Sequence, residues 1–403
     1  MGLIFKDRLH DDFGTWPLAY IPYGGADFGE IAAVGLAVGD GDDSAFYNAW
    51  VAAADRLAGD AQRLADQGRR TSARELFLRA SCFYGVSYHP LFGKPVDPRL
   101  VAAFRKQMDA FNKGLALRDP PVEPQRIPFE RTSLPACFIP AVGHESAVRP
   151  LLICTNGYDA TITDMFFASA VAATARGYHC LIFDGPGQGE MLVEHGMTLR
   201  PDWETVIKAV VDFALTLPLV DPARIALTGW SLGGHLAPRA ASGEHRLAAC
   251  IADPGLWSMT SGMRAFCEKL GLPAEAAANP ADMEQPLLDK MWQAISADRK
   301  LRWTIIQRGF WANGAENLRE FLRCIASFTL DGRAELIRCP TLITHAEADP
   351  LASSAQELFD ALRCPKTLVR FTSAEGAGTH CEMMNRSAVN RRVADWLDEV
   401  LGS

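Results

Sequence analysis

The stretch Arg224-Ile-Ala-Leu-Thr-Gly-Trp-Ser-Leu-Gly-Gly-His235 decides how this chain folds. An apolar run typical of a buried strand leads into Gly229-x-Ser231-x-Gly233, and small residues typical of a helix follow. The pentapeptide alone often arises by chance, but a strand before it and a helix after it are the setting of a nucleophilic serine. Positions two residues either side must then be nearly free of side chains, and both are glycine. We therefore predict that Ser231 is a nucleophile, held above a sheet at the positive end of a helix.

From residue 125 onward, short apolar runs alternate with helical stretches. Near-continuous apolar runs of this kind indicate the strands of a mostly parallel, twisted sheet that helices cover on both faces. The predicted fold class is therefore α/β. The predicted strands are Ile127–Glu130, Ala136–Ile139, Leu151–Thr155, His179–Asp184, Ile225–Thr228, Ala249–Ala252, Thr341–His345 and Thr367–Phe371.

The first part of the chain, residues 1–121, has the pattern of helices. We predict one helix that Ser44 caps and a second that opens with the capping-box pattern Ser72-Ala-Arg-Glu75. A third helix should begin at Asp97-Pro98. The run Asp119-Pro-Pro-Val-Glu-Pro124 breaks helical structure and marks the end of this region.

A second helical stretch, residues 255–332, interrupts the strand pattern and is rich in aromatic residues. An insertion between two strands of such a sheet commonly folds over their carboxyl ends, where ligands bind, so we interpret it as a cap. The alternative is that its aromatic side chains only form its own packing core. The predicted organisation is an N-terminal helical lid domain at 1–121, a core at 122–254 and 333–403, and a helical cap insertion at 255–332.

A serine hydroxyl needs a general base, which a carboxylate in turn orients. The turn around the serine is typical of the α/β-hydrolase fold, in which the chain order is serine, acid, histidine. His380 lies in a glycine-rich loop after the last predicted strand, and Asp349 follows the strand before it, so we predict these as base and acid. Glu347 is an alternative acid that we expect instead to form loop hydrogen bonds. Asp253 is another contender, although it also fits a turn ahead of Pro254-Gly255.

Acyl transfer also requires hydrogen-bond donors for the negatively charged oxygen that develops. One predicted donor is the backbone N–H of Leu232, directly after the nucleophile. The other is the N–H of Tyr158, because the turn Asn156-Gly-Tyr158 follows an earlier strand. The Tyr158 side chain fits a pocket wall and a structural ring equally well. The candidate substrate-binding residues are Trp230, Asp159 and Trp257.

Several motifs resemble those of one branch of the α/β-hydrolases, the group containing 2,6-dihydroxypseudooxynicotine hydrolase and the fungal polyketide-shortening hydrolases. The resemblance extends over nearly the whole chain from about residue 44. The motifs that carry it are Phe46-Tyr-Asn-Ala-Trp50, Ser72-Ala-Arg-Glu-Leu-Phe-Leu-Arg-Ala80, Phe183-Asp-Gly-Pro-Gly-Gln-Gly-Glu190, Gly229-Trp-Ser-Leu-Gly-Gly234, Cys339-Pro-Thr-Leu-Ile-Thr-His-Ala-Glu-Ala-Asp349 and Glu375-Gly-Ala-Gly-Thr-His-Cys381.

The resemblance implies an α/β-hydrolase core with an N-terminal helical lid, often dimeric, and a triad of Ser231, Asp349 and His380. Members of the group cleave esters or carbon–carbon bonds beside ketones. The additional glutamate that assists the carbon–carbon hydrolase has no assigned counterpart here, where the stretch after the serine turn and its helix is Ile251-Ala-Asp-Pro-Gly-Leu-Trp257. The 184–190 loop resembles the group's signature, and its glycines and proline predict a rigid turn beneath the site.

The composition of the chain excludes several classes of binding partner. The formal net charge of −8 and the lack of a basic run argue against nucleic acid or an anionic membrane. No apolar stretch is long enough to span a bilayer, and the N-terminus lacks the pattern of a secretion signal. Ten cysteines without CxxC pairs suggest buried thiols in a reducing compartment and no zinc site. We expect a cytoplasmic protein that needs no metal or other cofactor and forms a possible homodimer.

The predicted function is that of a serine hydrolase acting through an acyl-enzyme on a largely apolar or aromatic small molecule. Ester cleavage and cleavage of a carbon–carbon bond next to a ketone use the same constellation, so both remain open. One alternative is an acyltransferase that uses the same triad with an acceptor other than water. The other is a non-catalytic binding protein with the same fold.

Overall fold

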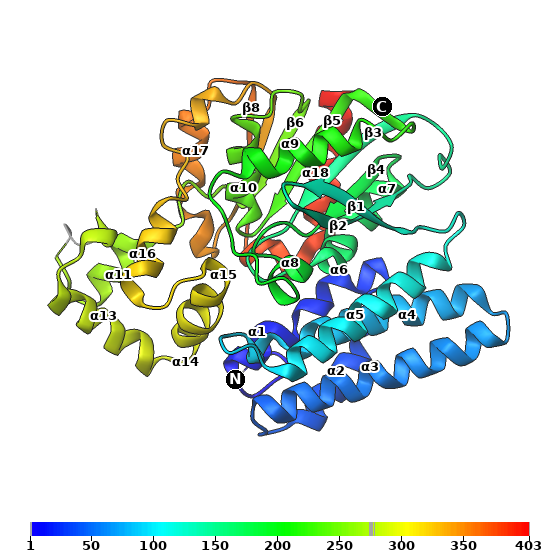
Figure 1. Ribbon diagram of the computed structural model, residues 1–403, viewed down its shortest axis with the longest axis horizontal. Coiled ribbons are helices and arrows are strands. Elements are labelled where there is room, and N and C mark those ends of the chain that lie inside the picture. The colour runs from blue at the N-terminus through cyan, green and yellow to red at the C-terminus, as the bar shows by residue number, and fades with distance from the viewer. Residues whose placement is uncertain (1, 274–276, 278, 403) are drawn as a thin grey trace.

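The computed structural model describes residues 2–273, 277 and 279–402. Within these residues an eight-stranded sheet has the order β1-β2-β4-β3-β5-β6-β7-β8 (Figure 1). Strand β2 is antiparallel to its neighbours β1 and β4, and the remaining neighbouring pairs are parallel. The mostly parallel sheet predicted from the sequence is confirmed. The strands are β1 (Pro124–Phe129), β2 (Thr132–Ile139), β3 (Arg149–Thr155), β4 (His179–Phe183), β5 (Val220–Trp230), β6 (Ala249–Asp253), β7 (Thr341–Ala346) and β8 (Lys366–Phe371).

The central strands are covered on both faces. Every residue of β4 and β6 is buried, as are six of the seven residues of β3. Burial without alternation is what a parallel sheet between two layers of helices requires. The elements that connect or flank these strands are α6 (Ile162–Met165), η3 (Phe166–Ala170), α7 (Val171–Ala175), α8 (Gly189–Val193), α9 (Trp203–Ala214), α10 (Gly233–Ala241), η6 (Ala334–Leu336), η7 (Pro350–Ser354), α17 (Ala355–Ala361), η8 (His380–Asn385) and α18 (Arg386–Leu401).

Helices precede the sheet, as predicted, and form the blue-to-cyan layer below it in Figure 1. Their aromatic side chains belong to the same apolar cluster as the strands, so the N-terminal helices share one core with the sheet. The ring of Trp16, for example, lies 5.6 Å from that of Trp230, next to the predicted nucleophile. The elements are α1 (Arg8–Gly14), η1 (Trp16–Tyr23), α2 (Phe28–Val38), α3 (Asp43–Asp66), α4 (Arg70–Ser87), η2 (His89–Leu91) and α5 (Pro98–Ala116).

Two of the three predicted helix starts in this region were wrong. Helix α3 is capped by Asp42, whose carboxylate accepts a hydrogen bond from the Ala45 N–H at 2.9 Å, so Ser44 lies inside the first turn. Helix α4 begins two residues before Ser72 and has no side-chain cap. The third start is confirmed, because Asp97 accepts from the Arg99 N–H at 2.8 Å.

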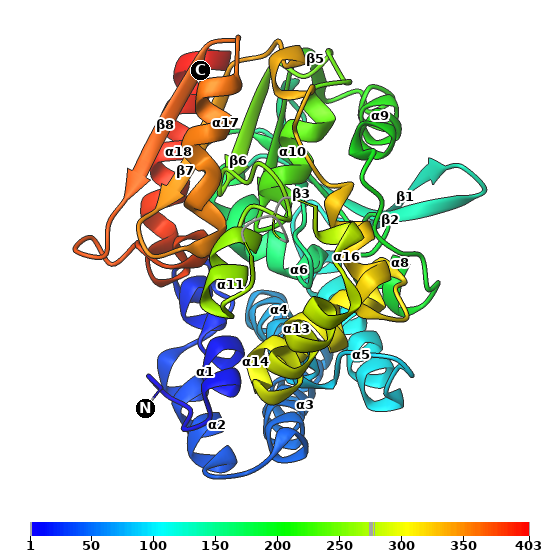
Figure 2. The ribbon, with the colours of Figure 1, turned by 90° about the vertical axis from the view of Figure 1, so that its left-hand side faces the viewer.

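The insertion, residues 255–332, leaves the sheet after β6 and returns before β7. Residues 274–276 and 278 of this segment lie outside the described residues. A bridge between Ser258 and Thr329 closes its base, and Figure 2 shows its helices Gln285–Ala297 and Arg299–Leu301 in front of the N-terminal helices. Its elements are α11 (Met263–Lys269), η4 (Pro280–Asp282), α13 (Gln285–Ala297), α14 (Arg299–Leu301), η5 (Arg302–Phe310), α15 (Trp311–Asn313) and α16 (Leu318–Ala326).

The aromatic residues of the insertion divide between two places. Phe310 and Phe321 pack within the insertion's own apolar cluster. Trp303 and Trp311 are buried in the main core, and Trp292 stays 40% exposed. Packing is therefore the role of most of these side chains. In the part of the chain that the structure describes, no helix combines the length and apolar character needed to cross a membrane.

Candidate active site

Ser231 lies at the turn between β5 and α10, where the sequence placed it. Its backbone has a φ of +61°, a strained value for a residue with a side chain. A Cβ on Gly229 would stand 1.8 Å from the Gly233 carbonyl oxygen, and one on Gly233 would stand 2.7 Å from that of Thr155. The glycines are therefore required by the close approach of backbone on both sides of the serine. Such stored strain is typical of a functional turn.

The structure brings Ser231, His380 and Asp349 into one hydrogen-bonded chain. The Ser231 hydroxyl lies 2.9 Å from Nε2 of His380, and Nδ1 of His380 lies 2.7 Å from Oδ2 of Asp349. Burial by itself would lower the pKa of His380, but the hydrogen bond and the charge of Asp349 raise it above its ordinary value. The imidazole is therefore held by the carboxylate on one side and reaches the hydroxyl with the other.

Asp349 is fixed for this contact. Its side chain is 1% exposed, and its other carboxylate oxygen accepts a hydrogen bond from the Leu351 N–H at 2.9 Å. Glu347 points elsewhere and accepts from the Ser373 N–H at 2.7 Å, which is the loop hydrogen bond expected of it. Of the two acids that the sequence left as alternatives, Asp349 contacts His380 and Glu347 contacts Ser373 instead.

The third candidate acid, Asp253, has a different position. Its carboxylate forms an ion pair with Arg386 and accepts a hydrogen bond from Thr344 Oγ1 at 2.9 Å. Its backbone oxygen accepts from the Ser231 N–H at 2.7 Å, and Arg386 donates to the Cys381 carbonyl at 3.0 Å. Asp253 therefore connects the serine turn to the histidine loop, a role beyond the simple turn residue considered from the sequence. Sequence pattern gives no signal for this pairing, because Arg386 is 133 residues away.

The loop after β3 lies beside the serine. A Cβ on Gly157 would stand 2.7 Å from the Cβ of Ser231, so the backbone of this loop faces the hydroxyl. Among the described residues, neither the Tyr158 N–H nor the Leu232 N–H donates a hydrogen bond to another protein group. Two free backbone donors next to a serine could stabilise a developing negative charge.

The predicted rigid turn at 184–190 braces this loop through contacts that the sequence did not reveal. The Gln188 amide donates to the carbonyl oxygens of Asn156 and Gly157 at 2.8 and 2.9 Å. The Asn156 amide in turn donates to Asp184 at 2.7 Å. Burial raises the pKa of Asp184 to about 8. Gln188 in the sequence motif was a sign that this turn makes a polar contact, but the pattern could not show that its partners lie on the loop after β3.

The three candidate substrate-binding residues have different surroundings. Trp230 is 2% exposed and packs against Trp16, and Asp159 is paired with Arg308 at 3.2 Å. Trp257 is half-buried, and its N–H donates to Ser354 Oγ at 3.0 Å. The side chains of Trp230 and Asp159 are therefore already engaged in contacts with other protein side chains. Within the described ranges, no three His, Cys, Asp or Glu side chains form a metal-binding group.

A strand, a strained serine turn and a helix, followed by an acid and a histidine in that chain order, define an α/β-hydrolase. A family model described as the alpha/beta hydrolase family matches residues 152–396, and the chain belongs to this family. Hydrolase acrC of Aspergillus aculeatus is 32% identical to it, over 98% of this chain and 96% of that protein. The 20-hydroxy-prefusarin hydrolase FUS2 of Gibberella moniliformis is 31% identical, over 94% of each.

A solved structure supports the architecture. The crystal structure of 2,6-dihydroxy-pseudo-oxynicotine hydrolase matches with a TM-score of 0.74, covering 96% of each chain at 23% identity. At that identity the likeness concerns the fold. It extends over the N-terminal helices and the insertion as well as the sheet, so all three parts have counterparts in one known protein.

Proposed function

We propose that this protein is a serine hydrolase that cleaves an ester, or a carbon–carbon bond next to a ketone, through an acyl-enzyme. The observation that carries the proposal is the chain of two hydrogen bonds that joins Ser231 to His380 and His380 to Asp349. Nucleophile, base and orienting acid within hydrogen-bond reach are what acyl transfer requires. The family membership and the hydrolase names of the relatives support the same reaction class.

In the proposed reaction, Ser231 attacks the substrate carbonyl while His380 accepts its proton. Asp349 stabilises the imidazolium that results. The backbone N–H groups of Tyr158 and Leu232 bind the oxygen as it becomes negative. His380 then gives the proton to the leaving group, an alcohol oxygen in an ester or a carbanion carbon in a retro-Claisen cleavage. Water, activated by the same histidine, releases the acid product.

The substrate that we propose is a largely apolar small molecule of polyketide type. Ser231 itself is 8% exposed, and the residue before it, Trp230, packs its ring against that of Trp16. An enclosed site favours a largely apolar ligand. Trp257, which is half-buried, is the candidate side chain left to contact it. One relative is named for a prefusarin substrate, which is consistent with this class.

A hydrolysis screen with aryl esters and β-diketones, comparing the wild type with Ser231→Ala, tests the proposal. The variant should lose activity on the order of 10³-fold or more on every substrate that the wild type cleaves. Ser242→Ala is the matched control, because its hydroxyl donates to the Arg239 carbonyl in α10 and does not touch His380. Full activity of Ser231→Ala would contradict the proposal. Adding competing alcohols distinguishes hydrolysis from acyl transfer.

A further inference from the structure

One helix of the insertion contacts both the N-terminal helices and the loop beside the nucleophile. This helix, η5, has π-helical geometry over nine residues. Long π-helical segments are rare, and π-bulges occur frequently at functional sites. Its position makes it a physical link between two parts of the molecule that come from opposite ends of the sequence.

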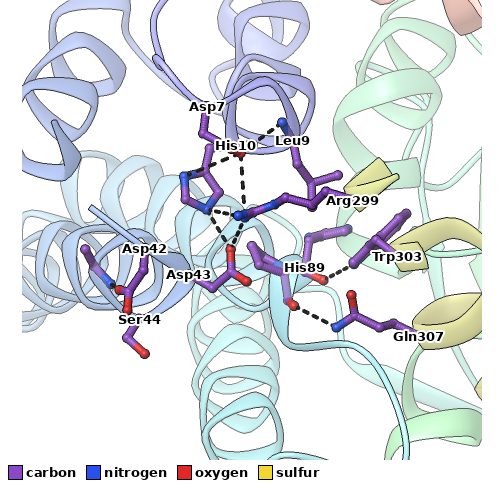
Figure 3. A network of polar contacts seen from close by, with 12 residues as sticks. Asp7, Leu9, His10, Asp42, Asp43, Ser44, His89, Arg299, Trp303 and Gln307 are labelled. Atoms are coloured by element: carbon purple, nitrogen blue, oxygen red, sulfur yellow. Dashed lines mark hydrogen bonds and ion pairs between the residues drawn. The ribbon is translucent and has the colours of Figure 1, made fainter. Parts of the chain in front are cut away.

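On one side, η5 is fixed to the N-terminal helices. The Trp303 indole donates to the His89 carbonyl at 2.7 Å, and the Gln307 amide donates to the Phe92 carbonyl at 3.1 Å. Just before η5, Arg299 pairs with Asp43 of α3 (Figure 3). Three side chains of the insertion therefore bind the N-terminal region, and two of them donate hydrogen bonds to its backbone carbonyl groups.

On the other side, Arg308 of η5 reaches the loop that carries the Tyr158 N–H. Its guanidinium lies 3.2 Å from the Asp159 carboxylate and 4.4 Å from the centre of the Tyr158 ring. It also lies 5.0 Å from the centre of the Trp303 ring, so it is held between two aromatic side chains. The side chains of Arg308 and Asp159 are 19% and 6% exposed. A pair this well enclosed is screened little by solvent, and the planar guanidinium fixes its partners in direction as well as distance.

A second contact acts on the same loop. Asn313, just beyond η5 in α15, donates a hydrogen bond to the Tyr158 hydroxyl. The guanidinium of Arg308 and the amide of Asn313, both from the insertion, thus contact residues 158 and 159 from the same side. Gln188, which donates to the Gly157 carbonyl, holds the preceding residue from the sheet side.

We propose that Arg308 is a positioning residue for the oxyanion site. Resting on the proposed function, the inference is that Arg308 fixes Tyr158 and Asp159, and with them the Tyr158 N–H, when the insertion is seated on the N-terminal helices. A donor that shifts by about 1 Å can cost 10²-fold in rate, and loss of one donor costs about 10²–10³-fold. The contacts of η5 with the N-terminal helices and with this loop therefore link the packing of the insertion to the position of the Tyr158 N–H.

The test compares Arg308→Met with Arg319→Met. Methionine is shorter than arginine but keeps an unbranched apolar side chain, and it removes the cation. Arg319 belongs to the same insertion and donates to the Met283 carbonyl at 2.9 Å, and among the described residues it forms no hydrogen bond or ion pair with residues 156–159. The measurements are kcat and KM for an aryl ester, the pH profile of kcat/KM, and inhibition by a trifluoromethyl ketone, which adds to the serine and places an oxyanion in the site.

Arg308→Met should lower kcat by roughly 10- to 100-fold with little change in KM. The acidic limb of its pH profile should stay in place or move slightly to higher pH, because His380 and Asp349 are untouched while Asp159, whose charge raises the pKa of His380, loses its cationic partner. The ketone should bind more weakly by a similar factor, since it needs the same donors. Arg308→Lys should fall between wild type and Arg308→Met, because an ammonium can pair with Asp159 but cannot stack as a planar group. Arg319→Met should resemble the wild type.

Asp159→Asn removes the same ion pair from the other partner and serves if Arg308→Met does not fold. It should reproduce the loss of kcat and the weaker ketone binding. A kcat for both variants equal to that of Arg319→Met, or an effect confined to KM, overturns the role of Arg308 while Ser231-dependent activity still stands. Full activity of Ser231→Ala overturns the proposed function itself, so the two failures are distinguishable.

Discussion

Gly157 faces Ser231 so closely that a Cβ on residue 157 would stand 2.7 Å from the Ser231 Cβ and 2.8 Å from the Trp230 carbonyl oxygen. Neither contact is with the flexible end of a side chain, so neither can be relieved without moving backbone or the serine itself. The absence of a side chain at 157 is therefore a condition for placing the loop beside the hydroxyl.

Gly157→Ala should therefore reduce kcat by about 100-fold or more, because either the loop or the serine must shift by a substantial fraction of 1 Å. The free energy of unfolding should fall by about 1–3 kcal/mol, the usual cost of overpacking. Steady-state kinetics and urea unfolding measure the two effects. The control is Gly59→Ala on an exposed face of α3, where a Cβ meets nothing within 4 Å and helix propensity improves. Equal kinetics for the two variants would contradict the steric argument.

Asp349→Asn tests the role of the Asp349 negative charge, because it removes the charge and leaves the other side chains of the site unchanged. The Asp349 charge raises the pKa of His380 against the opposing effect of burial, and His380 must be neutral to accept the serine proton. The acidic limb of kcat/KM in the wild type should therefore lie above about pH 6.5, the ordinary histidine value. The variant should move this limb to lower pH and lose roughly 10³- to 10⁴-fold in kcat.

Glu347→Gln is the control for this experiment, because Glu347 follows the same strand but accepts a hydrogen bond from Ser373. It should keep the wild-type rate and pH profile. If Glu347→Gln instead abolished activity and Asp349→Asn did not, the assignment of the acid would be reversed.

The sequence predicted the residues whose roles depend on local pattern. Ser231, Asp349 and His380 each follow a strand that its apolar run reveals, and the structure joins the three side chains as expected. Their catalytic roles stay predictions. The strand positions were also predictable, because central strands of a parallel sheet are apolar on both faces.

The sequence did not predict contacts that form only after distant segments meet. Gln188 holds a loop about thirty residues earlier, and Arg308 contacts a residue 149 positions away. Helix starts failed for a more local reason. Near Ser44 the aspartate two positions earlier, Asp42, is an equally good cap, and only the chain's direction of entry selects between them.

Helix α2 leads to a prediction about association. Phe28 and Leu36 on its surface are 62% and 85% exposed, and nearby Leu3 is 63% exposed. A helix that is apolar on its outer face as well as its inner one is typical of an interface. Because the sequence leads us to expect a homodimer, we propose that two copies of the chain pair through this face.

Leu36→Glu should weaken the dimer by at least about 2 kcal/mol, roughly 30-fold in Kd, because pairing would bury an unpaired charge. Light scattering over a concentration series measures the shift toward monomer. Leu215→Glu, at an apolar residue 41% exposed next to α9, is the matched control and should leave the mass unchanged. A wild type that is monomeric at all concentrations would refute the proposed interface.

Glu382 is a fully buried carboxyl group in the loop that carries His380. No described group donates a hydrogen bond to either of its oxygens, and its carboxylate neighbour, Asp253, can only accept one from the protonated acid. Burial, and then the negative charge of Asp253, raise the pKa of Glu382 well above its ordinary value, against the opposing effect of Arg386. The native state therefore holds this proton more tightly than the unfolded chain does.

The sign of the effect on stability follows from that difference. Below the unfolded pKa of about 4.3 the group is protonated in both states and contributes nothing to the pH dependence. As pH rises above 4.3 the unfolded chain loses the proton first, so stability falls until the folded pKa is reached. Each unit by which the folded pKa is raised costs about 1.4 kcal/mol at higher pH.

Glu382→Gln removes this cost, because an amide of nearly the same shape is neutral at every pH. The variant should be more stable than the wild type at pH 8, by about 1 kcal/mol or more, and the difference should shrink toward pH 5. Urea unfolding at the two pH values measures it, with the exposed Glu357→Gln as control. A variant less stable than the wild type at pH 8 would contradict this account and favour an ionised Glu382 that pairs with Arg386, whose Nη1 lies 4.0 Å away.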